Sequence, residues 1–168
     1  MATTLVKGGT VVSATGRTEA DVLIDGEKVV ALISPGTTPL GTINADTVID
    51  ATGKYVIPGG IDAHTHFELP FGGTEASDTF ETGTRAAAWG GTTTVVDFAV
   101  QTTGTRIQDG LAKWHEKAAG NCAIDYGFHQ IMGGVDDDSL TAMAGFVDEG
   151  ITSYKMFMAY PGVFYSDD

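Results

Sequence analysis

The sequence contains few cysteines and few basic residues, and each shortage excludes a class of site or partner. Cys122 is the only cysteine in 168 residues, so no disulfide can form within the chain and a zinc site built from several thiolates is excluded. Nine Lys and Arg residues stand against 22 Asp and Glu residues, which gives a formal net charge of −13. Such a charge repels nucleic-acid phosphates and anionic lipid headgroups. We therefore expect neither a nucleic-acid partner nor a membrane partner.

Long apolar runs are also missing. No stretch approaches the roughly 18 residues of a transmembrane helix. The first seven residues, MATTLVK, lack the basic and then apolar pattern of a signal peptide. We therefore expect a cytoplasmic protein. Hydrophobic residues make up 42% of the chain and charged residues 18%, which indicates a folded globular protein rather than a disordered one.

Residues 1–55 are predicted to form a small β-rich unit. Short β-branched runs alternate with turn residues, and the clearest pair, 21–25 and 27–33, is joined around Asp25-Gly26, which is typical of a tight hairpin. No helical periodicity appears in this part. Because an open sheet of this size is marginally stable alone, we expect it to pack on another part of the protein.

Residues 56–168 alternate between strand patterns and helix patterns. Strands are predicted at 55–63, 93–100, 122–129 and 151–158. Helices are predicted from Ser77 or Asp78 to Gly90, with Glu81 completing a capping box, from Ile107 to near Gly120, and from Asp136 to Gly150. The order predicts parallel strands, in a doubly wound sheet or a (β/α)8 barrel. No nucleotide-binding glycine motif follows the first strand, which disfavours the nucleotide-binding sheet.

Two histidines and one lysine carry the candidate chemistry. His64 and His66 are separated by one residue on a predicted strand, so both side chains point to one face and can bind one cation; a polar or hydrogen-bonded pair is the alternative. Lys155 lies among large apolar residues, where an unpaired ammonium is costly. Either its amine extends to water, or it is a neutral nucleophile that forms a Schiff base or a carbamate. A carbamate can bridge two cations.

Four segments carry a resemblance to a known family. They are 57–66 (IPGGIDAHTH), 69–74 (LPFGGT), 83–93 (GTRAAAWGGTT) and 153–160 (SYKMFMAY). Together they resemble the cyclic amidohydrolases, in particular the hydantoinase/dihydropyrimidinase branch and the bacterial D-hydantoinases within it. The likeness covers essentially the whole chain.

The resemblance implies an α/β fold, namely the N-terminal part of a metal-dependent (β/α)8 TIM barrel, with about four of its eight βα units, preceded by a small β-sandwich segment. The two parts would be residues 1–55 and 56–168. A complete barrel takes about 250 residues, so a barrel would be truncated here. The resemblance also implies a homotetramer for the full-length enzyme.

The same resemblance implies a hydrolase of carbon–nitrogen bonds. A hydroxide activated by two divalent metals, expected to be Zn²⁺, would open a hydantoin or dihydropyrimidine ring to an N-carbamoyl amino acid. His64 and His66 would bind one metal, and N6-carboxylated Lys155 would bridge both. Tyr160 would be catalytic and bind the substrate by stabilising the oxyanion. Leu69 and Phe157 would also bind the substrate, within an apolar wall that adds Phe67 and Phe71.

Several alternatives stay open. The family's other metal histidines and its proton-carrying aspartate belong to later strands, so we expect negligible turnover from these 168 residues alone. Glu68 occupies the position of an arginine in dihydroorotase-like chains, which favours a neutral ring. An allantoinase, a dihydroorotase and a non-catalytic dihydropyrimidinase-like scaffold remain as alternatives.

Three further polar residues have no assigned role. Asp97 would orient a ligand histidine or be solvated at a strand end, His129 would support the site or make a core hydrogen bond, and His115 is expected to be solvated.

Overall fold

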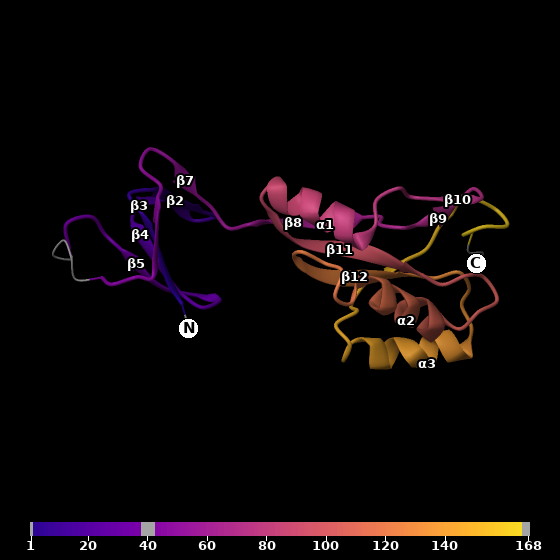
Figure 1. Ribbon diagram of the computed structural model, residues 1–168. Coiled ribbons are helices and arrows are strands. Elements are labelled where there is room, and N and C mark those ends of the chain that lie inside the picture. Colours follow the sequence, from indigo (N-terminus) through magenta and orange to yellow (C-terminus); the bar gives the residue numbers. More distant parts are fainter. Residues whose placement is uncertain (1, 38–42, 166–168) are drawn as a thin grey trace. The chain divides into compact units, whose positions relative to one another are not determined.

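The computed structural model describes residues 2–37 and 43–165. The chain divides into two compact units, Met1–Pro58 and Gly59–Asp168 (Figure 1). The ends of the two predicted ranges, residues 1 and 166–168, lie outside the described residues. No helix in the described part of the chain has the length and apolar character needed to cross a membrane.

The first unit contains strands and no helix among its described residues. One sheet has the order β5-β4-β1-β6 and a second has the order β3-β2-β7. The predicted hairpin around Asp25-Gly26 is present as the antiparallel pair β4 and β5. The strands are β1 (Thr3–Lys7), β2 (Thr10–Ser13), β3 (Gly16–Glu19), β4 (Asp21–Asp25), β5 (Lys28–Ile33), β6 (Thr47–Asp50) and β7 (Tyr55–Val56).

Burial in this unit is sparse. The buried apolar residues are Leu5, Ala20, Val22 and Ala51, whereas several large apolar side chains of β5 and β6 are exposed. Such exposed area is what a sheet shows when its apolar face is not covered within its own unit. The expectation that this β-rich segment packs on another part of the protein stays a prediction.

The second unit is built on a parallel four-stranded sheet with the order β13-β12-β11-β8. A two-stranded hairpin, β9 and β10, follows β8. The elements are β8 (Gly60–Thr65), β9 (Pro70–Phe71), β10 (Thr74–Glu75), α1 (Phe80–Trp89), β11 (Thr92–Val100), α2 (Ile107–Ala118), β12 (Asp125–Ile131), α3 (Asp137–Phe146) and β13 (Tyr154–Lys155). The described residues thus hold three complete strand–helix units and a fourth strand.

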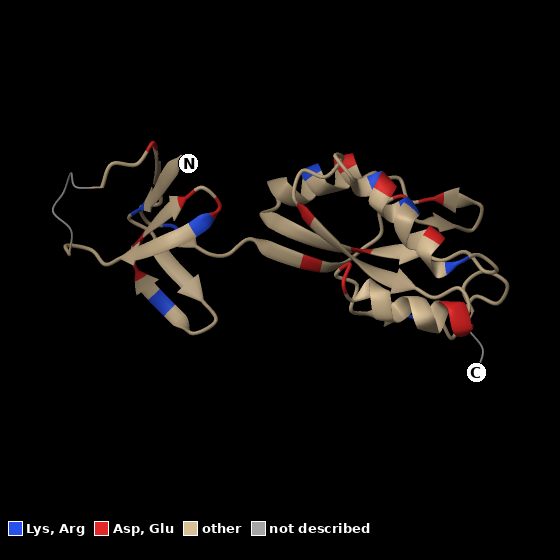
Figure 2. Cartoon of the chain, turned by 90° about the horizontal axis from the view of Figure 1, so that it is seen from below, with Lys and Arg blue, Asp and Glu red and all other residues tan. Residues whose placement is uncertain are grey.

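The core of this unit lies between the sheet and its helices. The apolar stripe of α2, with Ile107, Leu111, Trp114 and Ala118, is buried, as its spacing predicts. Helices α1 and α2 both contact β11, α1 contacts α2, and α2 contacts α3. The helices therefore contact one another in chain order, α1 with α2 and α2 with α3. Most Asp and Glu residues lie in this unit, many of them on helices and loops (Figure 2).

Several predicted boundaries were wrong. Helix α1 is capped by Thr79, which forms a capping box with Thr82, rather than by Asp78 with Glu81. The third parallel strand begins at Asp125, three residues after the predicted start at Cys122. The fourth strand comprises only Tyr154–Lys155 instead of residues 151–158, because only Gln130 and Ile131 of β12 pair with it.

Candidate metal centre

The ring of Phe98 is the common contact of the three side chains predicted as metal ligands. The ring centroids of His64 and His66 lie 4.7 and 4.9 Å from that of Phe98, and the two imidazoles are 5.0 Å apart, edge to face. The Lys155 Nζ lies 4.3 Å from the Phe98 ring centroid. Three side chains therefore surround one aromatic ring: His64 from β8, His66 from the residue after β8, and Lys155 from β13. We call these four residues the Phe98 face.

Burial and neighbouring charges favour neutral donors on the Phe98 face. Burial, with smaller contributions from the Lys155 and His64 charges, lowers the pKa of His66, while Asp97 opposes the shift. Burial also lowers the pKa of Lys155. An imidazole and an amine must both be deprotonated at nitrogen to bind a cation or to react with carbon dioxide. The electrostatics of the Phe98 face act in that direction.

One donor atom of the Phe98 face lacks a partner. His66 Nδ1 is buried and makes no hydrogen bond to any described residue. An unpaired buried ring nitrogen is costly, and a bound cation or a further donor would satisfy it. No set of three or more His, Cys, Asp or Glu side chains in the described part of the chain is arranged to hold a metal. Two imidazoles do not complete a metal centre by themselves, so a metal bound there would need further ligands.

His129 is not free to be a ligand. Its Nε2 lies 3.0 Å from the Ala63 carbonyl oxygen, and its Nδ1 shares a hydrogen bond with the Ser153 hydroxyl. Because a carbonyl can only accept, Nε2 donates to Ala63 and Nδ1 accepts from Ser153. Its ring also lies 4.7 Å from that of Phe98. His129 thus connects β8, β12 and the residue before β13 around the Phe98 face, and neither ring nitrogen is left for a cation.

The segment His64-Thr65-His66 lies at a β-bulge. Between the pairs Val95↔Asp62 and Asp97↔Thr65, β11 advances two residues while β8 advances three. Bulges of this kind change the direction of side chains and are frequent beside active sites. The simple alternation that predicts both histidines on one face is interrupted here, yet both rings contact Phe98.

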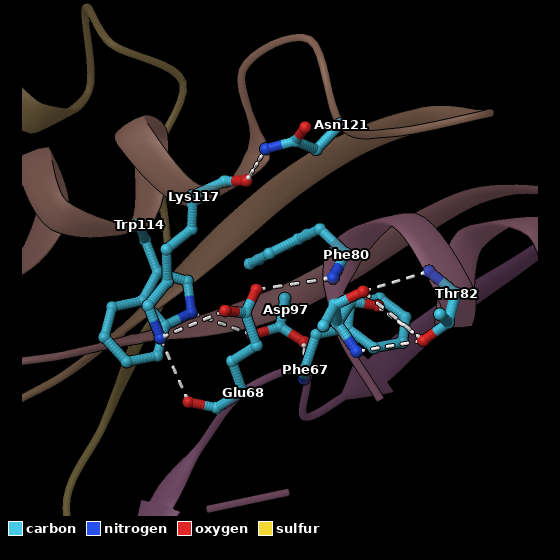
Figure 3. Close-up of polar contacts among 9 residues, drawn as sticks. Phe67, Glu68, Phe80, Thr82, Asp97, Trp114, Lys117 and Asn121 are labelled. Carbon is cyan, nitrogen blue, oxygen red and sulfur yellow. Dashed lines mark hydrogen bonds and ion pairs between the residues drawn. The ribbon is translucent and has the colours of Figure 1, made fainter. Parts of the chain in front are cut away.

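Asp97 lies on the opposite side of β11, fully buried. Its Oδ2 accepts hydrogen bonds from Thr65 Oγ1 (2.9 Å) and Phe67 N (2.8 Å), and its Oδ1 accepts from Phe98 N (2.8 Å) and Trp114 Nε1 (3.0 Å). Figure 3 shows the carboxylate between Phe67 and Trp114. Asp97 is therefore neither solvated at a strand end nor bonded directly to an imidazole.

Glu68 is engaged with the helices. Its Oε1 lies 3.9 Å from Lys117 Nζ, and its Oε2 accepts a hydrogen bond from Phe80 N at 3.4 Å (Figure 3). Lys117 also donates to the Glu68 carbonyl at 3.1 Å. The carboxylate thus has a cation and the start of α1 as partners. Because its charge is already compensated, Glu68 gives only weak grounds for excluding an acidic ring.

The predicted substrate-binding residues fall into two groups. Tyr160 is half exposed and contacts the rings of Phe71 and Phe157 at 5.2 and 6.0 Å, and Phe157 also lies 4.7 Å from Lys155 Nζ. Leu69 is half-buried and packs against the apolar core. Phe71 and Phe157 can therefore share a wall, next to the amine.

Two side-chain predictions were wrong. Phe67 is only 7% exposed and packs on Phe80 at 5.3 Å, so it belongs to the core and not to an apolar wall. His115 is half-buried, with its ring edge-on to Phe128 at 5.1 Å, rather than fully solvated. Phe98 and the bulge were not predicted as parts of the site. Only the position of Phe98 next to Asp97 in a β-branched strand could have pointed to it.

Comparison with known proteins adds an independent observation. Residues 55–149 match the Amidohydrolase family. The chain is 61% identical over 165 residues to the D-hydantoinase of Streptomyces coelicolor, covering 98% of this chain and 35% of that protein. The D-hydantoinase of Geobacillus stearothermophilus is 49% identical, with 99% and 34% covered.

A solved structure gives the same likeness in three dimensions. The dihydropyrimidinase from Brevibacillus agri superposes with a TM-score of 0.91 at 51% identity, covering 99% of this chain and 35% of that one. The chain therefore spans about a third of the length of the relatives that it matches.

Proposed function

Because the chain belongs to the amidohydrolase family, we propose that the protein carrying it hydrolyses a cyclic amide, opening a hydantoin or dihydropyrimidine ring to an N-carbamoyl amino acid. The likeness to D-hydantoinases and to a dihydropyrimidinase supports this substrate class. The single observation that carries the proposal is the convergence of His64, His66 and Lys155 on the Phe98 ring.

The proposed cofactor is a pair of divalent metal ions, expected to be Zn²⁺. When bound, such ions make a water molecule nucleophilic at neutral pH and polarise the scissile carbonyl. His64 and His66 would hold one of them. The buried, unpartnered Nδ1 of His66 and the lowered pKa of that imidazole support a neutral ligand.

Lys155 is proposed to be carboxylated at Nζ and to bridge the two ions. Its neutral amine would attack carbon dioxide and lose a proton, giving a carbamate with two oxygens and one negative charge. The lowered pKa of Lys155 supports the neutral amine that this step needs. The carbamate would then bring an anion to the position where Lys155 Nζ now lies over the rings of Phe98 and Phe157.

Tyr160 is proposed to donate its phenolic hydrogen to the ring carbonyl oxygen as negative charge develops there. Its backbone has φ 65°, a left-handed conformation that is unusual for a bulky residue and is often found at functional sites. The Tyr160 carbonyl accepts hydrogen bonds from the backbone N–H groups of Val163 and Phe164 at 3.1 and 3.2 Å, which hold the turn. Leu69 and Phe157 are proposed to contact the substituent of the ring.

The test is a substrate panel on the full-length product of the gene. We expect turnover of hydantoins and dihydrouracil to exceed turnover of allantoin and dihydroorotate. A preference for dihydroorotate would contradict the proposal, and it is a meaningful outcome because Glu68 is already paired with Lys117.

A non-catalytic scaffold is the competing function. Metal analysis separates the two, because about two metal ions per chain are expected for the hydrolase and none for a scaffold. The persistence of His64, His66 and Lys155 around one ring favours the hydrolase. A barrel completed by further strands, a β-sandwich that includes residues 1–55, a homotetramer and a cytoplasmic location belong to this proposal as well.

A further inference from the structure

We propose that Asp97 is a positioning residue that fixes His66 by binding the residues on both sides of it. The Oδ2 atom of Asp97 accepts one hydrogen bond from the Thr65 hydroxyl at 2.9 Å and one from the Phe67 N–H at 2.8 Å. His66 is the residue between these two donors. The inference deepens the proposed function and rests on it, because it takes His66 as a metal ligand.

The sheet alone does not fix His66. Strand β8 ends at Thr65, and the pairing of β8 with β11 ends at Thr65↔Asp97. The bulge between Asp62 and Thr65 interrupts the regular hydrogen-bond ladder just before this point. The carboxylate of Asp97 supplies hydrogen bonds at the position where the backbone ladder stops. The carboxylate therefore holds the chain around His66 in place, as backbone hydrogen bonds do for residues within a strand.

The carboxylate is well suited to hold this geometry. Asp97 is fully buried, and none of the ion pairs among the described residues includes it. Among the described residues, four hydrogen-bond donors contact its carboxylate, two on each oxygen. Moving the backbone on either side of His66 would leave part of a buried charge unsatisfied, which is costly. The position of His66 is thereby tied to a rigid network.

The second oxygen anchors the network to a helix. Trp114 of α2 donates to Oδ1 at 3.0 Å and is itself buried in the apolar core. The two carboxylate oxygens thus bind different parts of the fold. Oδ2 holds the backbone around His66, and Oδ1 holds the carboxylate against β11 and α2. This division allows the two roles of Asp97 to be tested separately.

The test uses variants of Thr65 and Trp114 in the full-length, zinc-loaded gene product. Thr65→Val removes one donor to Oδ2 and keeps the branched shape, and Thr65→Ser keeps the donor. Trp114→Phe removes one donor to Oδ1 and leaves both Oδ2 bonds in place. Zinc affinity is measured by competition with a chelator, kcat and KM with a hydantoin, and thermal unfolding with the metal-free proteins.

We expect Thr65→Val to weaken zinc binding by about 10-fold or more and to lower kcat, with KM within about twofold of the wild type. Thr65→Ser should restore both values. Trp114→Phe should unfold at a lower temperature and bind zinc with unchanged affinity. Zinc affinity that follows unfolding temperature across all three variants would overturn the positioning role, as would a Thr65→Val protein that binds zinc like the wild type. Wild-type protein that holds no zinc would overturn the proposed function itself.

Discussion

The two sides of β11 differ in how completely their polar groups are satisfied. On one side, all four hydrogen-bond donors around Asp97 meet a carboxylate oxygen within 3.0 Å. On the other side, the Phe98 face carries a buried His66 nitrogen without a partner and a lysine over two aromatic rings. A fully satisfied network stabilises the fold, whereas a buried nitrogen without a partner, next to another imidazole and an amine, indicates a place for a ligand. Asp97 and Phe98 are neighbours in β11, yet they face a satisfied network on one side and the candidate site on the other.

The largest effect is expected from removing a donor on the Phe98 face. His64→Ala in the full-length gene product should lose the metal and reduce turnover by at least about 1000-fold. The reason is that His64 would bind the metal ion, and the metal ion makes the attacking water nucleophilic. Metal content and hydantoin turnover are the measurements, and the unfolding temperature of the metal-free protein should stay close to that of the wild type. Full activity of His64→Ala would show that the Phe98 face is not the metal centre.

The second prediction concerns the opposite side of β11. Asp97→Asn should lower the free energy of unfolding by about 3 kcal/mol, because an amide keeps one acceptor oxygen and turns an NH₂ group toward donors. Denaturant unfolding followed by circular dichroism measures the change. Asp109→Asn, on the first turn of α2, is the matched control and should change stability by less than about 0.5 kcal/mol. Equal stability of the two variants would remove the difference between the two sides of the strand.

The smallest effect is expected from replacing the lysine with an apolar residue. Because burial lowers the pKa of Lys155, the unfolded chain binds more protons than the folded chain between that lowered pKa and the ordinary value of 10.5. The stability of the metal-free, uncarboxylated protein should therefore rise with pH through this window. Lys155→Met should remove the rise and increase the unfolding temperature at neutral pH by about 2 °C.

The control for this prediction is Lys113→Met, since Lys113 lies exposed on α2. Thermal scans from pH 7 to above pH 10 measure both variants. If Lys155→Met were less stable than the wild type and kept the same pH slope, the amine would be stabilising rather than costly.

Much of the second unit could be predicted from sequence because its signals are local. The β-branched run gave β11 to within one residue, and the spacing of Ile107, Leu111 and Trp114 gave α2. The cap of α1 was wrong because Asp78, Thr79 and Thr82 all have capping side chains, and only the tertiary position of the helix selects among them. The predicted fourth strand, 151–158, was too long because apolar residues also occur in loops that pack on a core.

The sequence singles out the candidate ligands, but it does not predict the residues that surround them. His64, His66 and Lys155 stand out by spacing and by chemistry, and a resemblance gave them roles. The bulge before Thr65 and the contacts of Phe98 depend on the register between two strands separated by some 30 residues, which no local pattern encodes. The hydrogen bonds of Asp97 likewise join β8, β11 and α2, so the sequence left its role open.

We propose that the Phe98 face holds a metal ion in the full-length protein. The most direct measurement is a crystal structure of the zinc-loaded, full-length gene product, with anomalous scattering recorded at the zinc edge. We expect a zinc peak about 2.0–2.1 Å from one imidazole nitrogen of His64 and of His66, with an oxygen of carboxylated Lys155 also bound. A zinc peak elsewhere, with Lys155 still an unmodified ammonium over the Phe98 ring, would contradict it.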